Sequence, residues 1–167
     1  ELRKLIGEEV TGAPVEIALQ ENRLFLRVGT SLLVTRLVDG QFPDYRQVIP
    51  TGGSRVAIVE REPFYRAVRR VSTVTADRVS LVRFGFTADR AAVTAVNPEI
   101  GEASEDVAAE CTGGDIELGM NARYVMDVFS VIEQEKVVIE MNEVLSPVLV
   151  RPLGDEGYRC VVMPMRL

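Results

Sequence analysis

The side chains that could carry out chemistry in this sequence are carboxylates and arginines, because its 167 residues include no histidine. Without histidine, Ser-His-Asp and Cys-His nucleophile systems and most zinc sites are excluded. The glycine pairs in "TGGS" and "CTGGD" lack the lysine and the spacing of a phosphate-binding loop, and no G-x-G-x-x-G pattern occurs. We therefore expect no catalytic residue, no cofactor and no metal site, and a protein that is not an enzyme.

The densest group of carboxylates lies in "NPEIGEASED" and comprises Glu99, Glu102, Glu105 and Asp106. A pair of carboxylates can hydrolyse a glycoside or hold Mg²⁺, but only when a pocket surrounds it. This group falls instead on a short polar edge between predicted strands, where charges control which strands pair. We interpret it as a solvated or partner-facing edge.

Three arginines gather on one face of a helix predicted over residues 63–75. At about 100° per residue, Arg66, Arg69 and Arg70 share that face with no acid between them. The opposite face is apolar and consists of Phe64, Ala67, Val68 and Val71. The basic face is either solvated or in contact with phosphates. Because the net charge is −6, any contact with nucleic acid is expected to be local and independent of base sequence.

The sequence finishes in the apolar segment "VVMPMRL". Proline donates no hydrogen bond, so the segment from Met163 to Met165 cannot continue a central strand. Methionines beside a rigid proline make a surface that adapts to varied apolar side chains. The segment is therefore either a strand packed on its own core or the wall of a peptide-binding site.

The elements that must position these residues follow from the spacing of apolar side chains. Helical spacing predicts helices over 2–10, 63–75 and 122–135, the last with Asn121 as its N-cap. The third helix is predicted to bury Tyr124, Val128, Val131 and Ile132. Alternation predicts strands over residues 15–19, 23–29, 31–38, 79–86, 91–97, 105–113, 115–120, 136–142, 146–153 and 158–167.

A helix followed by three strands recurs at a period of about 60 residues, which predicts an α+β fold built from a repeated unit. The composition, 47% hydrophobic and 26% charged, is that of a globular protein. No apolar run approaches the roughly 18 residues that a membrane span needs. Cys111 and Cys160 lie far apart in alternating segments, so we expect reduced thiols and a cytoplasmic location.

Three motifs in order, "LVDGQFPDYRQVIP", "MNARYVMDVF" and "MPMRL", closely resemble the bacterial DNA polymerase sliding clamp family, the beta subunit of the replicative polymerase. The resemblance covers essentially the whole chain. It implies a DNA-clamp fold with helices on the inner face and sheets on the outer face. It also implies that residues 1–46 are the C-terminal part of the middle domain and residues 47–167 a complete third domain, with the rest of the protein absent.

The function that this resemblance implies is that of a DNA replication processivity factor. Two three-domain subunits would form a homodimeric ring around double-stranded DNA of any sequence, with Arg66, Arg69 and Arg70 facing the DNA. The subunit interface would include Thr73, Val74, Glu102 and Glu105. A closed ring is not expected from this fragment alone, and no membrane partner is expected. The alternative is a non-enzymatic α+β protein-interaction domain unrelated to DNA.

The same resemblance implies a hydrophobic groove that binds linear motifs of the polymerase catalytic subunit, the clamp loader and repair proteins. By motif match its residues are Pro43, Val48, Val79, Asn121, Tyr124, Leu145, Pro147, Val161, Met163, Pro164, Met165, Arg166 and Leu167. The sequence departs from the family at Gln47, often an arginine, and at Val79, where a larger aromatic can sit. The other wall of the groove would belong to the absent part of the middle domain.

Overall fold

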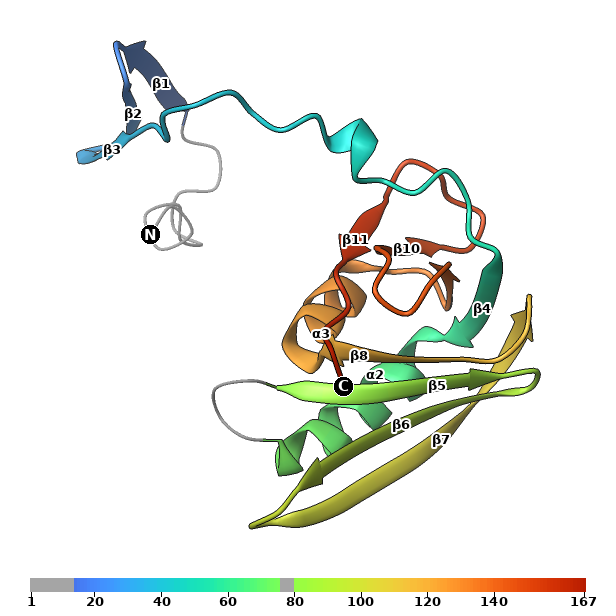
Figure 1. The fold of residues 1–167 in the computed structure, drawn as a ribbon. Coiled ribbons are helices and arrows are strands. Elements are labelled where there is room, and N and C mark those ends of the chain that lie inside the picture. The colour runs from blue at the N-terminus through green and yellow to red at the C-terminus, as the bar shows by residue number, and fades with distance from the viewer. Residues whose placement is uncertain (1–13, 76–79) are drawn as a thin grey trace. The chain divides into compact units, whose positions relative to one another are not determined.

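A computed structural model describes residues 14–75 and 80–167 of the chain (Figure 1). Two compact units are present, residues 1–43 and residues 44–167. The helix predicted over 2–10 and the groove residue Val79 lie outside the described residues.

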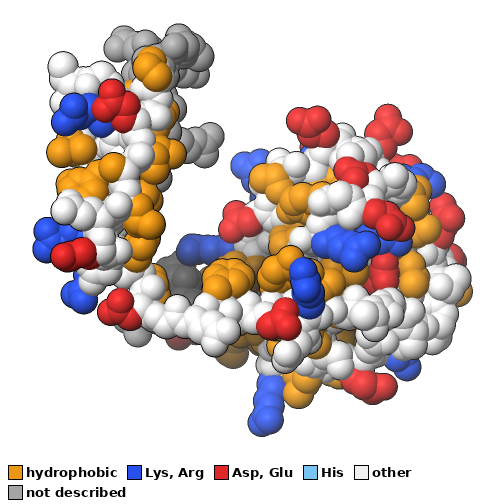
Figure 2. All heavy atoms as spheres, turned by 90° about the horizontal axis from the view of Figure 1, so that it is seen from above, with side chains coloured by type: hydrophobic (Ala, Val, Ile, Leu, Met, Phe, Trp, Pro, Cys, Tyr) orange, Lys and Arg blue, Asp and Glu red, His pale blue; other side chains and the backbone are white. Residues whose placement is uncertain are grey.

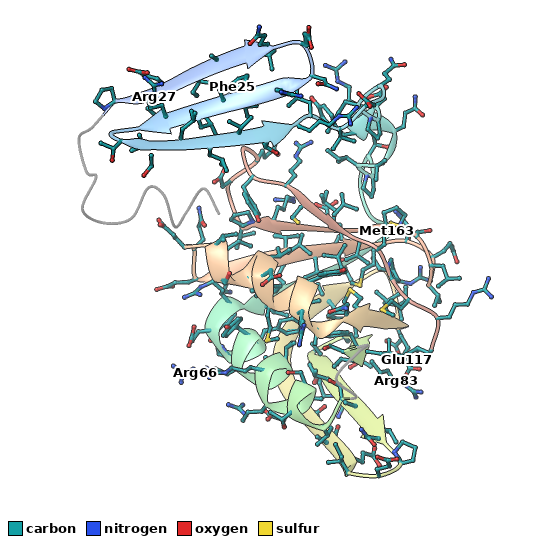
Figure 3. The ribbon with its side chains drawn as sticks, turned by 90° about the vertical axis from the view of Figure 1, so that its left-hand side faces the viewer. Phe25, Arg27, Arg66, Arg83, Glu117 and Met163 are labelled. Carbon is teal, nitrogen blue, oxygen red and sulfur yellow. The ribbon has the colours of Figure 1, made fainter. Side chains whose placement is uncertain are left out.

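The first unit contains a three-stranded antiparallel meander of β1 (Val15–Gln20), β2 (Arg23–Val28) and β3 (Ser31–Arg36). The three strands predicted here are confirmed. Alternation along β1 and β2 places aliphatic side chains on one face, where Ile17 lies opposite Leu26. Phe25 and Arg27 belong to the other face (Figure 3).

The second unit holds ten regular elements in the order β4 (Arg55–Glu60), α2 (Arg61–Val71), β5 (Leu81–Thr87), β6 (Arg90–Asn97), β7 (Gly101–Thr112), β8 (Ile116–Asn121), α3 (Ala122–Val131), β9 (Lys136–Met141), β10 (Val148–Pro152) and β11 (Cys160–Val162). Short 3-10 turns, η2 (Tyr45–Gln47) and η3 (Ser72–Val74), precede β4 and follow α2. The eight strands form one antiparallel sheet in the order β11-β10-β9-β4-β7-β6-β5-β8. Both helices pack together on one side of it (Figure 1).

The second unit is built from one motif used twice, a strand, a helix and three strands. The helices begin at Arg61 and Ala122, 61 positions apart (122 − 61), which confirms the repeat and the α+β fold. The strand β4 was not predicted, because "RVAIVE" is almost continuously apolar instead of alternating. It lies between β7 and β9, where alternate residues Ala57 and Val59 are buried.

The core is centred on α2, whose Phe64 ring lies 5.0 Å from the ring of Phe129 in α3 and 5.9 Å from that of Phe84 in β5. The apolar stripe predicted for this helix is confirmed, because Phe64, Ala67, Val68 and Val71 are all buried. The helix begins two residues before the predicted start, and its last predicted residues form η3.

The prediction for α3 is confirmed for Val128 and Ile132, which are buried, and is wrong for Tyr124, for Val131 and for the length of the helix. Tyr124 and Val131 are each 61% exposed, because the buried stripe runs through Ala122, Val125 and Val128 instead. The helix ends at Val131 rather than at residue 135, since Ile132 turns to an extended conformation and is itself buried.

The C-terminal segment also differs from its prediction as a strand over 158–167. Strand β11 stops at Val162, before the Met163-Pro164 step that cannot extend the ladder. The chain then crosses to β8 at the opposite end of the sheet order, where the Met165 N–H donates to the carbonyl of Gly119 at 2.7 Å. The terminal segment thus joins the two ends of the sheet.

The carboxylate group lies on and beside β7, a strand of 12 residues that is longer than the predicted edge. Residues 101–108 pair with β6 and residues 109–112 pair with β4. Among the described residues, no strand pairs with the other side of 101–108, so this part of β7 is an open edge. Glu102 and Glu105 lie on the open edge, and Glu99 lies just before it.

Cys111 in β7 and Cys160 in β11 are both free, as predicted. In the described part of the chain, no helix has the length and apolar character needed to cross a membrane.

Candidate functional surfaces

The basic face of α2 is partly neutralised. Arg66 Nε donates to Glu62 Oε1 at 2.7 Å, one helical turn earlier. No acid lies between the three arginines, as predicted, but Glu62 precedes them at the i,i+4 position that favours such a pair, which the sequence reading missed. All three arginines are exposed, and Figure 3 shows Arg66 projecting from the outer side of the helix. Within 14–75 and 80–167, Arg69 forms no ion pair and presents a full positive charge.

Arg70 and Glu105 form a two-pronged ion pair between α2 and the open edge of β7. Arg70 Nε and Nη2 donate to the two carboxylate oxygens, each at 2.5 Å. These hydrogen bonds lower the pKa of Glu105 and raise the pKa of Arg70. The structure thus brings together one residue predicted to face DNA and one predicted to lie at a subunit interface.

The other predicted interface residues, Thr73, Val74 and Glu102, border the region of the Arg70–Glu105 pair. Thr73 lies in η3 and donates its hydroxyl to the Arg70 carbonyl at 2.7 Å. Val74, in the same turn, is half-buried against the core. Glu102 is exposed on the open edge of β7.

The predicted groove residue Asn121 fixes the start of α3. Its side-chain oxygen accepts from the N–H groups of Arg123 at 2.9 Å and Tyr124 at 3.4 Å, so the predicted N-cap is confirmed. Capping sets the first turn of the helix, and this turn carries Tyr124 with most of its ring exposed.

Gly119 brings the terminal segment against β8 and was not predicted as a site residue. A Cβ atom at this glycine would lie 2.7 Å from the Met165 carbonyl oxygen and 2.9 Å from Leu167 Cδ2. Only a residue without a side chain permits this approach. A glycine inside the predicted strand "DIELGM" was the available signal, because such glycines often mark a close backbone contact.

Of the remaining groove residues, Pro164 and Met165 are half-buried and Arg166 is exposed in the terminal segment, and the others fall into three groups. Val161 in β11 lies opposite Leu149 in β10, and Pro147 directly precedes β10. Apolar side chains that are about half exposed include those of Val48, Leu145, Met163 and Leu167. Pro43 belongs to the first unit, whereas the others belong to the second. Asn121 ends β8, the strand whose Gly119 contacts the terminal segment, and Tyr124 lies in the helical turn that follows.

The face of the sheet that points away from the helices carries paired charges of both signs. Arg83 lies 3.5 Å from Glu117 across β5 and β8, and the two are adjacent in Figure 3. Arg90 lies 3.2 Å from Asp106 across β6 and β7. Figure 2 likewise shows acidic and basic side chains interspersed on the visible face of the larger unit. In the described ranges, no group of three or more potential ligands is arranged to hold a metal ion.

Solved structures with the same architecture are sliding clamps. The chain matches a Pseudomonas aeruginosa DNA polymerase sliding clamp with a TM-score of 0.82 and 32% identity, over 98% of this chain and 44% of that one. It matches a Bartonella birtlesii sliding clamp, solved bound to griselimycin, with a TM-score of 0.81 and 34% identity, over 92% and 41% of the two chains. The fold is that of the sliding clamps.

Sequence comparison gives the family within this class. Residues 46–166 match the family described as DNA polymerase III beta subunit, C-terminal domain. The beta sliding clamps of Caulobacter vibrioides and Pseudomonas aeruginosa are 32% and 33% identical to this chain over 99% and 100% of its length. The chain belongs to the DNA polymerase III beta subunit family, which confirms the resemblance. It spans 46% and 45% of those two relatives.

Proposed function

We propose that this chain is part of a replication processivity factor, a ring that encircles duplex DNA and tethers the replicative polymerase through a peptide-binding groove. The clamp loader and repair proteins would use the same groove. The protein would act without catalysis, by holding its partners on DNA. Family membership favours this function over that of an interaction domain unrelated to DNA.

The observation that carries the proposal is the position of the terminal segment. Its backbone is fixed to β8 by the Met165–Gly119 hydrogen bond, while the side chains of Met163 and Leu167 remain about half exposed. Tyr124 presents a third apolar surface from the capped start of α3. An ordered backbone with exposed, flexible apolar side chains suits short motifs with varied apolar residues.

Contact with DNA would come from α2. Arg66, Arg69 and Arg70 are exposed on the helix that lies on one side of the sheet, and such side chains bind phosphates without reading bases. The two ion pairs to Glu62 and Glu105 weaken this contact, which suits a protein that must slide rather than bind one position. The subunit joint would use the open edge of β7 with Thr73, Val74, Glu102 and Glu105. Residues 1–46 would complete a middle domain, and residues 47–167 would form the third.

The test is a titration of the chain with a fluorescent peptide of the type Gln-Leu-x-Leu-Phe, followed by anisotropy. We expect saturable binding that is lost when Met163–Leu167 are removed. The control is Val96→Ser, which removes another exposed apolar side chain, from strand β6. A peptide with both leucines and the phenylalanine replaced by alanine controls for unspecific binding.

Two results would contradict the proposal. One is the absence of binding to a chain that also contains the missing wall of the groove. The other is equal binding to the intact and truncated chains, which would place the peptide elsewhere. Circular dichroism of the truncated chain must match that of the intact chain, because the terminal segment also joins the two ends of the sheet.

A further inference from the structure

A pocket of about 490 Å³ lies on the second unit, outside the predicted groove. One side is the segment around η2, which contributes Tyr45, Arg46 and Ile49. The other side is the outward face of β9 and β10, with Glu140, Leu149 and Arg151. Arg159, just before β11, completes the rim. The pocket therefore has an apolar floor and arginines around it.

Only some of the arginines that line this pocket are neutralised by carboxylates. Arg151 donates Nε to Glu140 Oε1 at 2.7 Å, and both side chains are largely buried, so this pair is fixed. Arg159 lies 3.5 Å from Glu156, whose side chain is 81% exposed, which makes a weak pair. Arg46 packs its guanidinium 5.9 Å from the centre of the Tyr45 ring and has no ion pair among the described residues. Donors on Arg46 and Arg159 are thus available to a ligand.

The pocket borders two residues of the predicted groove. Val161, a groove residue, lies directly opposite Leu149 of the pocket in the pairing of β10 with β11. Val48, another groove residue, directly precedes Ile49 of the pocket. The opposite end of the groove lies at Gly119 and Tyr124. A peptide that leaves the groove past Val161 would therefore enter the pocket.

We propose that this pocket binds a carboxylate-bearing segment that flanks the linear motif of a partner. The inference rests on the proposed function, because the motif itself must occupy the groove. Guanidinium groups bind carboxylates through paired N–H donors, which makes Asp or Glu the complementary side chains. The whole chain has a net charge of −6 and repels acidic peptides at long range, so a preference for acids must arise at this pocket.

The experiment uses four labelled peptides that share the motif Gln-Leu-x-Leu-Phe. Two carry three Glu residues, one on its N-terminal flank and one on its C-terminal flank. The other two carry three Gln residues in the same positions. Binding to the 167-residue chain is measured at about 50 mM and about 500 mM salt, where screening differs strongly. We expect acidic residues to strengthen binding from one flank only, by roughly three- to tenfold at low salt for two exposed ion pairs. The double variant Arg46→Gln/Arg159→Gln should abolish this preference and leave binding of the Gln-flanked peptides unchanged.

The matched control is Arg83→Gln, which removes an exposed arginine paired with a glutamate at the same 3.5 Å separation as Arg159. It should leave the preference intact. Equal binding of Glu- and Gln-flanked peptides would overturn this inference alone, as would a preference that survives the double substitution. Failure of all four peptides to bind to a chain that also contains the missing wall would overturn the groove and this inference together.

Discussion

The guanidinium of Arg70 holds the carboxylate of Glu105 with two hydrogen bonds of 2.5 Å, across the junction of α2 and the open edge of β7. The same carboxylate therefore neutralises a charge on the proposed DNA surface and occupies the proposed subunit joint. A change at Arg70 or at Glu105 is therefore expected to affect both surfaces. A partner that draws Glu105 away would release Arg70 for contact with phosphates.

Replacing Glu105 by glutamine should tighten binding to duplex DNA. The change frees Arg70 to contact one more phosphate, so the slope of log K against log salt concentration should steepen by about 0.9. Binding of a labelled duplex of arbitrary sequence, measured at several salt concentrations, gives this slope. Glu117→Gln removes the same charge from the face of the sheet that points away from the helices, and should leave the slope unchanged. Equal slopes for both variants would contradict a special role for the Arg70–Glu105 pair.

The same pair should stabilise the fold in a pH-dependent manner. The hydrogen bonds from Arg70 lower the pKa of Glu105 in the folded state, below its usual value of about 4.3. The stabilisation is therefore present above that pH and is lost as the pH falls through the lower, folded-state pKa. Melting temperatures of the original chain and Glu105→Gln should differ at pH 7 and converge as the pH falls through the lowered folded-state pKa of Glu105. A difference that stays constant across this range would show that the ion pair is not its cause.

Substitution of Gly119 by alanine should weaken peptide binding without altering any terminal residue. The added Cβ would lie 2.7 Å from the Met165 carbonyl oxygen, so the terminal segment must move away from β8. We expect affinity for the motif peptide to fall roughly fivefold or more, the equivalent of one lost hydrogen bond. Gly85→Ala is the control, because its Cβ would lie 3.8 Å from the nearest atom, an ordinary contact. If both variants bind alike, the contact with β8 does not position the groove wall.

Removal of the cap on α3 should cost stability. Asn121→Ala leaves the N–H groups of Arg123 and Tyr124 without their acceptor, and we expect a loss of about 1 kcal/mol. Urea unfolding measures the change, and Asn121→Ser should retain most of the stability because serine also caps. Equal losses for Ala and Ser would mean that the amide acts through its shape and not as a cap.

Sequence reasoning succeeded where the spacing of apolar residues indicated a single buried helix face. Helix α2 alternates arginines with four apolar residues on one stripe, so its buried face could be predicted. Helix α3 contains apolar residues on nearly every side, and two neighbouring stripes fit almost equally well; the sequence alone could not choose between Tyr124 and Val125. Only the packing of Phe129 on Phe64 selects the phase.

Strand β4, which was not predicted, could have been predicted from the repeat. Moving β8, residues 116–121, back by the 61-residue spacing gives residues 55–60, which are the bounds of β4. The pair of Arg66 with Glu62 could also have been predicted from its i,i+4 spacing. By contrast, Glu105 is 35 residues from Arg70 and Met165 is 46 residues from Gly119 (165 − 119). Contacts at that separation depend on the sheet order, which no local pattern contains.

The open edge of β7 would also govern how quickly the proposed subunit joint comes apart. Residues 101–108 present main-chain N–H and C=O groups with no partner strand in the described structure. A partner that supplied a strand would extend the eight-stranded sheet across two chains, and its release would require several main-chain hydrogen bonds to break together. Because such bonds fail cooperatively, the lifetime of the joint would depend on the length of the paired edge more than on any one side chain. Opening would then be a rare, concerted event that an external agent must drive.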